Sequence, residues 1–188
     1  MNDQSMNWKD LHIDKSWSLF LDRDGVINKK IDDDYVRSID QFEWLPGVRD
    51  AIRQLSSLFG KIIIITNQQG VGKGLMTGEA VEFIHDHIID SISMAGGKID
   101  AVYYAPQLKS DNSDFRKPNT GMALLAKKDF PTIDFSKSIM VGDSMSDMEF
   151  GRKAGMKTVF ILNGKNVPGN PLIDDSCSDL LSFAEKMK

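Results

Sequence analysis

The chain has 188 residues, of which 41% are hydrophobic and 27% are charged. This length and composition are typical of one globular domain with a sizeable apolar core. The net charge of -4 argues against a dedicated nucleic-acid binder, because such proteins usually carry a basic surface that neutralises phosphates. A single cysteine, Cys177, excludes an internal disulfide and a cysteine-based zinc site, which fits a reducing compartment.

The first sixteen residues are polar and carry charges of both signs, so we expect them to precede a single domain that spans residues 17–188. They lack the apolar core of a signal peptide. No apolar run along the chain approaches the roughly 18 residues that a membrane helix needs. These features predict a cytoplasmic protein with no membrane partner.

Apolar runs rich in β-branched residues alternate with amphipathic stretches along the rest of the chain. The expected strands are 17–21, 61–66, 101–104, 138–141 and 158–162. The expected helices are 47–59, 79–94, 120–129, 146–154 and 178–186. This alternation is typical of a parallel sheet covered by helices on both faces. The predicted fold class is therefore α/β, as a three-layer Rossmann-like domain.

Polar residues follow several of these expected strands at the point where each strand ends. The first strand stops abruptly at two carboxylates, Asp22 and Asp24, although an unpaired buried charge is costly. A lone pair of this kind is usually a polar turn. Thr66 and Asn67 stand at the end of the second strand, Gly142 and Asp143 at the end of the fourth, and Arg116 and Lys117 lie in the long loop after Tyr104. Because ligands bind outside the carboxyl ends of strands in an open α/β sheet, we expect these groups to meet at one edge.

The residue types at this edge indicate a metal ion and a phosphoryl group. Asp22, Asp24 and Asp143 would repel one another by roughly 4 kcal/mol per close pair at an effective dielectric constant of about 20, so they need a cation. Oxygen ligands without a nearby histidine or cysteine favour Mg²⁺. Lys117 and Thr66 add a positive charge and a neutral donor, which suit a phosphoryl group that is attacked in line.

Four segments, taken in chain order, carry a family resemblance. They are DRDG at 22–25, IIIIT ending at Thr66, RKP around Lys117, and GDSMSD at 142–147. Together they resemble the motifs of the haloacid dehalogenase superfamily of phosphohydrolases. From about Leu19 to Ile161 the chain is most similar to the heptose bisphosphate phosphatase and histidinol phosphatase branch, through the segments DRDGVIN, TNQQGVGKG, YYAPQ, RKPNTGM and VGDSMSDM.

The resemblance implies a magnesium-dependent phosphatase that works through an aspartyl-phosphate. It assigns Asp22 as the nucleophile and Asp24 as the general acid and then the general base. It assigns Thr66 and Lys117 to the transferring phosphoryl group. Asp22, the backbone carbonyl of Asp24, and Asp143 would hold Mg²⁺. The chemistry agrees with this division, because a carboxylate attacks a phosphate readily only where positive charge offsets their repulsion.

The resemblance also implies a phosphorylated sugar as the small-molecule substrate, most closely D-glycero-D-manno-heptose 1,7-bisphosphate, which would lose its 7-phosphate. The residues expected to contact the substrate are Asp34, Tyr35, Asn67, Gln68, Gln69, Lys73, Arg116 and Ser144. Asp147 is expected to support the metal site from behind. Lys73 could equally be a solvated surface lysine. The acidic run 32–34 could equally be a solvated loop. We further expect a monomer.

Other functions are compatible with parts of the pattern. Histidinol phosphate is the nearest alternative substrate. A polynucleotide 3′-phosphatase is disfavoured by the acidic charge balance. A non-catalytic binding domain that kept the fold would be expected to have lost one of the catalytic carboxylates or the lysine, and the sequence retains them all.

One segment departs from the family pattern. Members often hold a zinc ion with a Cys-x-His pair and a Cys-x-Cys pair that flank a loop before the RKP motif. In this sequence these places hold Ala105, Gln107, Ser113 and Phe115. We therefore expect no zinc, and a loop, 106–114, that is shaped by hydrogen bonds and packing. The short intervals between the motifs leave no room for a separate cap domain, so the site should be comparatively open.

Overall fold

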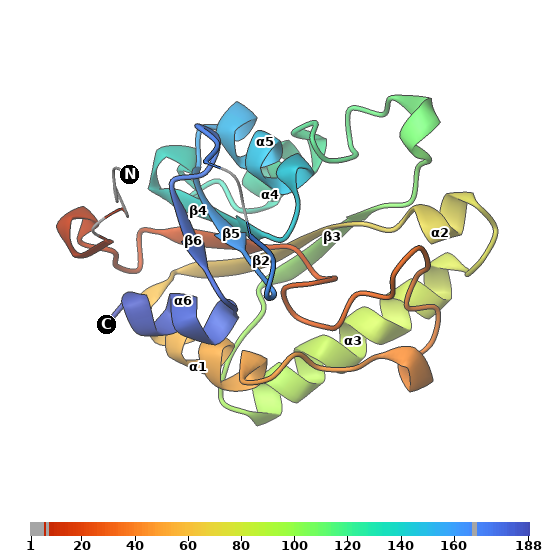
Figure 1. Ribbon diagram of the computed structural model, residues 1–188, viewed down its shortest axis with the longest axis horizontal. Helices are drawn as coiled ribbons and strands as arrows, with labels where there is room; N and C mark the ends of the chain where they lie inside the picture. The colour runs from red at the N-terminus through yellow and green to blue at the C-terminus, as the bar shows by residue number, and fades with distance from the viewer. Residues whose placement is uncertain (1–5, 7, 167–168) are drawn as a thin grey trace.

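The computed structural model describes residue 6, residues 8–166 and residues 169–188. It confirms the predicted α/β class, because a six-stranded parallel sheet lies between two layers of helices (Figure 1). The strand order is β3-β2-β1-β4-β5-β6, with β1 and β4 at the centre of the sheet. The strands are β1 (Ser18–Leu21), β2 (Lys61–Asn67), β3 (Ala101–Ala105), β4 (Ser138–Gly142), β5 (Lys157–Ile161) and β6 (Asp175–Cys177).

The helices are divided between the two faces of the sheet. One face packs on α1 (Val48–Leu58), α3 (Gly78–Met94) and α6 (Leu180–Lys186). The other face packs on α4 (Gly121–Asp129) and α5 (Met145–Ala154). The remaining elements are the short helix α2 (Gln69–Gly72) and the 3-10 turns η1 (Trp8–Leu11), η2 (Ile39–Gln41), η3 (Lys109–Asp111) and η4 (Phe135–Lys137). Among the described helices, none combines the length and the apolar character needed to cross a bilayer.

The core explains why the strands read as unbroken apolar runs. Leu19 and Leu21 pack into the cluster below one face of the sheet, whereas Phe20 packs into the cluster on the other face. The isoleucines of β2 alternate between the two clusters in the same way. Successive strand residues point to opposite faces, and both faces are covered, so every position must be apolar.

All the strands and helices expected from the sequence are present, and their ends are displaced by two residues at most. The short elements α2 and β6 were not predicted. The QGVG sequence of α2 has the glycine content of a turn, and the DSC sequence of β6 has no apolar alternation. Both depend on tertiary contacts, since such short segments carry little intrinsic preference.

The segment before β1 packs against α6 and the amino end of β6. Trp8 is buried, and its ring meets Phe183 of α6 edge-to-face with 5.9 Å between the ring centroids. Its indole nitrogen donates a hydrogen bond of 2.7 Å to Asp175 Oδ2 at the start of β6. Part of the polar N-terminal segment is thus attached to the core.

Candidate active site

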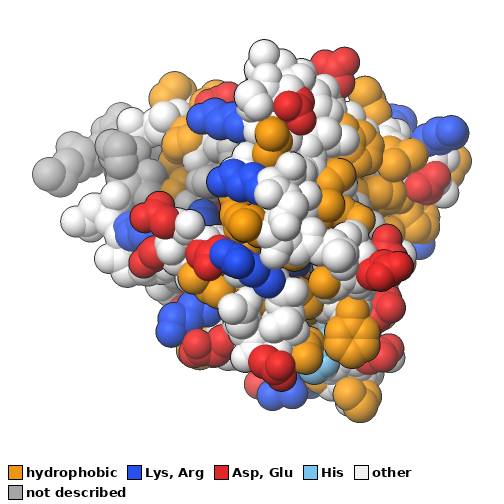
Figure 2. All heavy atoms as spheres, turned by 90° about the vertical axis from the view of Figure 1, so that its right-hand side faces the viewer, with side chains coloured by type: hydrophobic (Ala, Val, Ile, Leu, Met, Phe, Trp, Pro, Cys, Tyr) orange, Lys and Arg blue, Asp and Glu red, His pale blue; other side chains and the backbone are white. Residues whose placement is uncertain are grey.

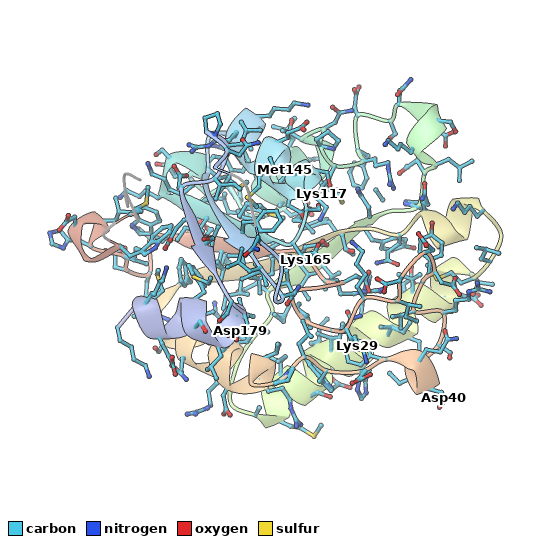
Figure 3. All side chains as sticks on the ribbon, viewed as in Figure 1. Lys29, Asp40, Lys117, Met145, Lys165 and Asp179 are labelled. Atoms are coloured by element: carbon cyan, nitrogen blue, oxygen red, sulfur yellow. The ribbon has the colours of Figure 1, made fainter. Side chains whose placement is uncertain are left out.

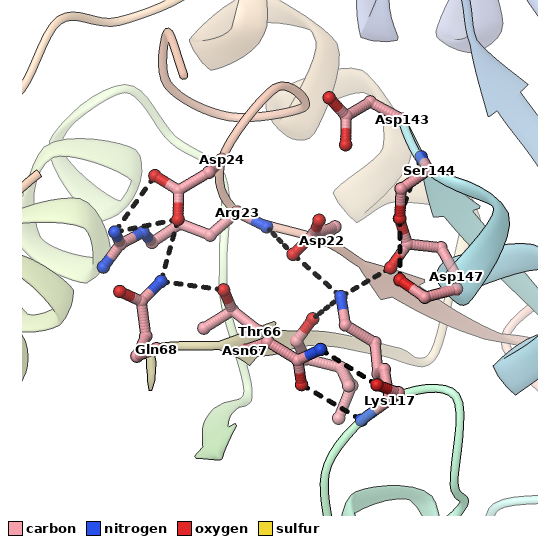
Figure 4. Close-up of polar contacts among 12 residues, drawn as sticks. Asp22, Arg23, Asp24, Thr66, Asn67, Gln68, Lys117, Asp143, Ser144 and Asp147 are labelled. Carbon is pink, nitrogen blue, oxygen red and sulfur yellow. Dashed lines mark hydrogen bonds and ion pairs between the residues drawn. The ribbon is translucent and has the colours of Figure 1, made fainter. Parts of the chain in front are cut away.

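The two carboxylates of the DRDG motif lie where β1 leaves the sheet, at its carboxyl end. The ladder between β1 and β4 extends one residue beyond β1, because the Asp22 N–H donates to the Val141 carbonyl at 2.9 Å. β2 and β4 end beside it, so residues from three strands and the RKP loop converge on one point (Figure 4). This convergence is the one that parallel topology predicts.

Three carboxylates form a compact cluster at this point. One oxygen each from Asp22, Asp143 and Asp147 lies within 4.8 Å of the others. Gly25 makes room for the cluster: its φ is +89°, and a Cβ there would stand 2.2 Å from Asp143 Oδ2. Only glycine satisfies both conditions, which gives the glycine of the DRDG motif a physical reason.

Lys117 supplies the buried positive charge among these acids. Its Nζ lies 2.9 Å from Asp22 Oδ1 and 2.6 Å from Asp147 Oδ1, and it donates to the Ile65 carbonyl at 2.8 Å. Burial alone would lower the pKa of Lys117, but the charges of Asp147 and Asp22 outweigh it and raise the pKa above its usual value. The ammonium ion is therefore held charged beside the expected nucleophile.

The backbone at Lys117 is held by Asn67 at the end of β2. The Asn67 amide nitrogen donates to the Lys117 carbonyl at 3.1 Å, and its amide oxygen accepts from the Lys117 N–H at 3.0 Å. These two bonds hold the Lys117 backbone in the way that a neighbouring strand would. Asn67 thus holds the backbone of Lys117 in addition to lining the cavity described below.

One buried lysine does not balance three acids. Burial raises the pKa of Asp22 to about 7, and the neighbouring Asp147 and Asp143 add to the effect while Lys117 opposes it. Burial also raises the pKa of Asp143. Both shifts mean that the cluster needs a further cation to stay fully ionised near neutral pH.

The geometry fits Mg²⁺. The cluster offers only oxygen atoms, and Asp143 Oδ1 is buried without a hydrogen-bond partner among the described residues. The carbonyl oxygen of Asp24 accepts no hydrogen bond from the described residues, so it is also available as a metal ligand. A hard divalent ion that takes carboxylate, carbonyl and phosphate oxygens matches this donor set. Asp147, in contrast, uses its oxygens on Lys117 and on Ser144.

The Asp24 side chain turns away from the acid cluster and onto Arg23. Arg23 Nη2 lies 3.0 Å and 2.9 Å from the two Asp24 oxygens, while the amide groups of Asn28 and Gln68 each donate to one of them at 2.9 Å and 2.8 Å. Burial would raise the pKa of Asp24, but the Arg23 charge and these hydrogen bonds outweigh it, and the pKa lies below its usual value. Asp24 is thus held as a carboxylate.

Arg23 has a side chain that is fully buried although it stands between two motif acids. It extends below the site, where Nη1 lies 3.4 Å from His85 Nε2 of α3. Burial, followed by the nearby Arg23 charge, lowers the pKa of His85 to about 3. The imidazole is therefore neutral and can accept from Arg23. The sequence alone does not reveal this contact, because sixty-two positions separate the two residues.

A cavity of about 450 Å³ opens beside Asp22. It is lined by most of the residues that the sequence predicts to contact the phosphoryl group or the rest of the substrate. Those on its wall are Asp22, Asp24, Asp34, Tyr35, Thr66, Asn67, Gln69, Lys73, Arg116, Lys117 and Ser144. Figure 2 looks onto this side of the molecule, where lysine and arginine side chains gather near the middle of the face with acidic side chains around them.

Three predicted site residues are not on the cavity wall. Gln68 is fully buried and donates from one amide nitrogen to Thr66 Oγ1 at 2.9 Å and to Asp24. Asp143 stands within the acid cluster, and Asp147 lies beneath it with its oxygens turned to Lys117 and to the start of α5. From these positions Gln68, Asp143 and Asp147 can hold the reacting groups in place, but they do not line the cavity wall that a distal part of the substrate would contact.

Lys30 also lines the cavity, and the sequence analysis missed it. Its Nζ lies 3.7 Å from Asp143 Oδ2, on the solvent side of the acid cluster opposite the buried Lys117. Asp33, Ile31, Val36 and Ser146 complete the wall. Lys30 follows the DRDG motif closely in the sequence, but nothing in the sequence distinguishes Lys30 from its neighbour Lys29.

The loop 106–114, at the place of the family's zinc loop, is shaped by hydrogen bonds. Asp111 accepts from the Leu108 N–H at 2.9 Å, and the Asn119 amide donates to the Ser113 carbonyl at 3.1 Å. The Gly121 N–H closes the loop on the Asp114 carbonyl at 2.9 Å. This agrees with the expectation that hydrogen bonds shape the loop, and the absence of bound zinc stays a prediction.

Comparisons with known proteins agree with this site. The family described as HAD-hydrolase-like matches residues 114–174. The D-glycero-alpha-D-manno-heptose-1,7-bisphosphate 7-phosphatase of Mycobacterium bovis is 44% identical over 172 residues, which cover 89% of this chain and 90% of that protein. The D-glycero-beta-D-manno-heptose-1,7-bisphosphate 7-phosphatase of Escherichia coli is 35% identical over 158 residues, covering 80% and 81%.

Solved structures show the same likeness. The D,D-heptose 1,7-bisphosphate phosphatase from B. bronchiseptica, in complex with magnesium and phosphate, superimposes with a TM-score of 0.80 at 29% identity, covering 91% of this chain and 97% of that one. The enzyme of the same name from Burkholderia thailandensis gives a TM-score of 0.62 at 26% identity, covering 90% and 96%. The chain therefore belongs to the haloacid dehalogenase (HAD) superfamily of phosphatases, as its motifs predict.

Proposed function

We propose that this protein is a magnesium-dependent phosphatase that removes the 7-phosphate from D-glycero-D-manno-heptose 1,7-bisphosphate. The observation that carries the proposal is the arrangement of Asp22 and Lys117 on the wall of a cavity with Asp143 clustered beside Asp22, in a chain that is 44% identical to such an enzyme over most of its length. Bound Mg²⁺ would offset the repulsion between the Asp22 carboxylate and the phosphoryl oxygens.

In the first step an Asp22 carboxylate oxygen attacks the phosphorus atom, and the bond between phosphorus and the sugar oxygen breaks. Lys117, which lies 2.9 Å from Asp22, and Thr66 on the cavity wall bind the phosphoryl oxygens as charge shifts onto them. The leaving sugar oxygen takes a proton from Asp24. The products of this step are the heptose 1-phosphate, now with a free 7-hydroxyl group, and an aspartyl-phosphate at Asp22.

In the second step water attacks the phosphorus atom of the aspartyl-phosphate, and Asp24 takes the proton of this water. Inorganic phosphate leaves, and Asp22 returns to a carboxylate. The contacts with Arg23, Asn28 and Gln68 favour the ionised form of Asp24, which is the form that this base step uses. To serve as the acid in the first step, Asp24 must bind a proton and turn from Arg23 toward the leaving oxygen.

The cavity wall also suits a second anionic group. Arg116 and Lys73 lie on it together with Tyr35, so two cations besides Lys30 and Lys117 are available to such a group. Asp33 and Asp34 are on the same wall and can accept hydrogen bonds from sugar hydroxyls. The same two acids could pair with the ammonium group of histidinol phosphate, which makes this compound the second candidate substrate. Cytoplasmic location and a monomeric state stay predictions from the sequence.

The proposal is tested by steady-state kcat/KM with Mg²⁺ across a substrate panel. The panel holds both anomers of the heptose 1,7-bisphosphate, histidinol phosphate, 3′-phosphorylated DNA and common sugar monophosphates. We expect one heptose anomer to exceed the other substrates by about 100-fold or more, which is about 2.7 kcal/mol of transition-state discrimination. A flat profile would keep the phosphatase chemistry and reject the heptose assignment, and a maximum at histidinol phosphate would select the second candidate.

A further inference from the structure

Gln69 lies on the cavity wall in the α2 segment, and its side chain joins this segment to two loops that are far apart in the sequence. Gln69 is the first residue of α2, which follows β2. Its amide nitrogen donates to the Tyr35 hydroxyl at 2.8 Å, in the loop between β1 and α1. Its amide oxygen accepts from the Lys109 N–H at 3.2 Å, in loop 106–114. One side chain thus bridges loops that are far apart in the sequence.

A backbone contact next to Gln69 joins two of the same segments. The Gly72 N–H donates to the Pro106 carbonyl at 3.1 Å. A Cβ at Gly72 would lie 2.6 Å from that carbonyl oxygen and 3.2 Å from the Leu108 side chain, so a glycine is needed for this approach. In Figure 1, α2 and the η3 segment lie together on the right-hand side.

The joined loops also hold the two cations at the outer part of the cavity. Arg116 Nη1 donates to the Gln107 carbonyl at 3.3 Å, so loop 106–114 sets the position of its guanidinium group. The Lys73 ammonium lies 5.2 Å from the centre of the Tyr35 ring, which is within the range of a cation–π contact. A shift of either loop would therefore move one cation relative to the other.

The Gln69 amide has both its oxygen and a nitrogen engaged by the protein. Sequence reasoning predicted a substrate contact, whereas the geometry points to a different role. We propose that Gln69 is a positioning residue: it clamps the three segments and thereby sets the spacing of Arg116 and Lys73 for a second anionic group of the substrate. This inference rests on the proposed bisphosphate substrate.

The role predicts a separation of kinetic effects in Gln69→Leu, which keeps the size of the side chain and removes both hydrogen bonds. We expect KM for the heptose 1,7-bisphosphate to rise about 10-fold with kcat changed less than about 2-fold. With p-nitrophenyl phosphate, which has no second anionic group, both constants should stay within about 2-fold of the parent protein. The matched control is Gln41→Leu, because Gln41 is exposed and accepts one bond from the Arg37 N–H away from the cavity.

The Tyr35→Phe variant tests the clamp through one bond only. It should raise KM for the bisphosphate in the parent protein and have no further effect in the Gln69→Leu background, because the bond is already lost there. Additive effects of the two substitutions would show that Tyr35 and Gln69 act independently and would overturn the proposal.

Hydrogen–deuterium exchange tests the clamp without any substrate. Gln69→Leu should raise amide exchange in residues 106–114 of the free protein, whereas Gln41→Leu should leave it unchanged. An equal loss of kcat on both substrates, or no effect beyond that of Gln41→Leu, would reject the positioning role. If the parent protein hydrolyses p-nitrophenyl phosphate and does not prefer a bisphosphate, the proposed substrate fails, and the exchange measurement still decides whether the clamp exists.

Discussion

Two neighbouring lysines meet different surroundings, and they provide a matched test of the cavity at the scale of single residues. Lys30 lines the cavity beside Asp143, whereas Lys29 pairs with Glu43 at 3.2 Å on an exposed surface (Figure 3, where Lys29 is labelled). Lys30→Met should lower kcat/KM for phosphorylated substrates by about 5- to 10-fold, because a cation near the phosphoryl group is lost. Lys29→Met should stay within about 2-fold, and equal effects would make Lys30 a surface residue.

The nucleophile itself is tested by Asp22→Asn. The amide has nearly the shape of the carboxylate and cannot form an acyl phosphate, so kcat should fall by about 1000-fold or more. The protein should still fold, since the substitution removes one member of a crowded acid cluster and leaves the Lys117–Asp147 pair in place. Substantial activity in a folded Asp22→Asn variant, measured by single-turnover kinetics, would remove Asp22 from this role.

Metal removal tests the same cluster. Chelation should abolish activity, and added Mg²⁺ should restore it, because Asp22 and Asp143 are left with too little positive charge nearby. Mg²⁺ should also raise the melting temperature in a concentration-dependent way, as any ligand of the folded state does. Added zinc should not restore activity, and a requirement for zinc would contradict the interpretation of loop 106–114.

At the scale of elements, α3 contributes a buried histidine to the support of the site. His85 has its pKa lowered to about 3 by burial, with the Arg23 charge adding to the effect, whereas an unfolded histidine titrates near 6.5. Between these values the unfolded state binds the extra proton, so the free energy of unfolding falls as the pH falls. The expected contribution is about 1.4 kcal/mol per pH unit below about pH 6.

Urea unfolding at pH 5, 6 and 7 measures this slope. The His85→Gln variant keeps an acceptor for Arg23 and has no titrating group, so its unfolding free energy should depend less steeply on pH than that of the parent protein. The comparison isolates His85, because every carboxylate is common to both proteins. Parallel pH profiles would mean that His85 is not held neutral in the folded state.

At the scale of the whole molecule, the catalytic edge and the N-terminal attachment lie at opposite ends of the sheet. Trp8 is buried against α6 and hydrogen-bonded to Asp175, which Lys186 also contacts at 2.9 Å. Trp8→Ala should reduce the free energy of unfolding by about 3 kcal/mol through lost burial and the cavity that remains. Chemical denaturation measures this loss, and kcat/KM under stable conditions should change less than about 2-fold. A large change in kcat/KM would show that the attachment communicates with the site.

The sequence by itself determined the longer strands and helices in chain order, the fold class and most of the groups at the carboxyl edge of the sheet. It could do so because apolar periodicity reports burial directly, and because parallel strands must place their carboxyl ends on one side. The acids Asp22 and Asp143 are visible because charge at the end of a buried strand has few structural explanations. Lys117 lies in the loop after β3 and is visible through the RKP motif.

Tertiary structure alone decided which side chains face one another. Arg23 lies between two motif acids in the sequence and yet turns to His85, and the Gln69 amide contacts the Tyr35 hydroxyl and the Lys109 N–H. Lys30 lines the cavity while the adjacent Lys29 does not. Each case depends on contacts between residues far apart in the chain, and such contacts leave no periodic pattern, because the direction of a loop side chain is set by the neighbours that pack around it.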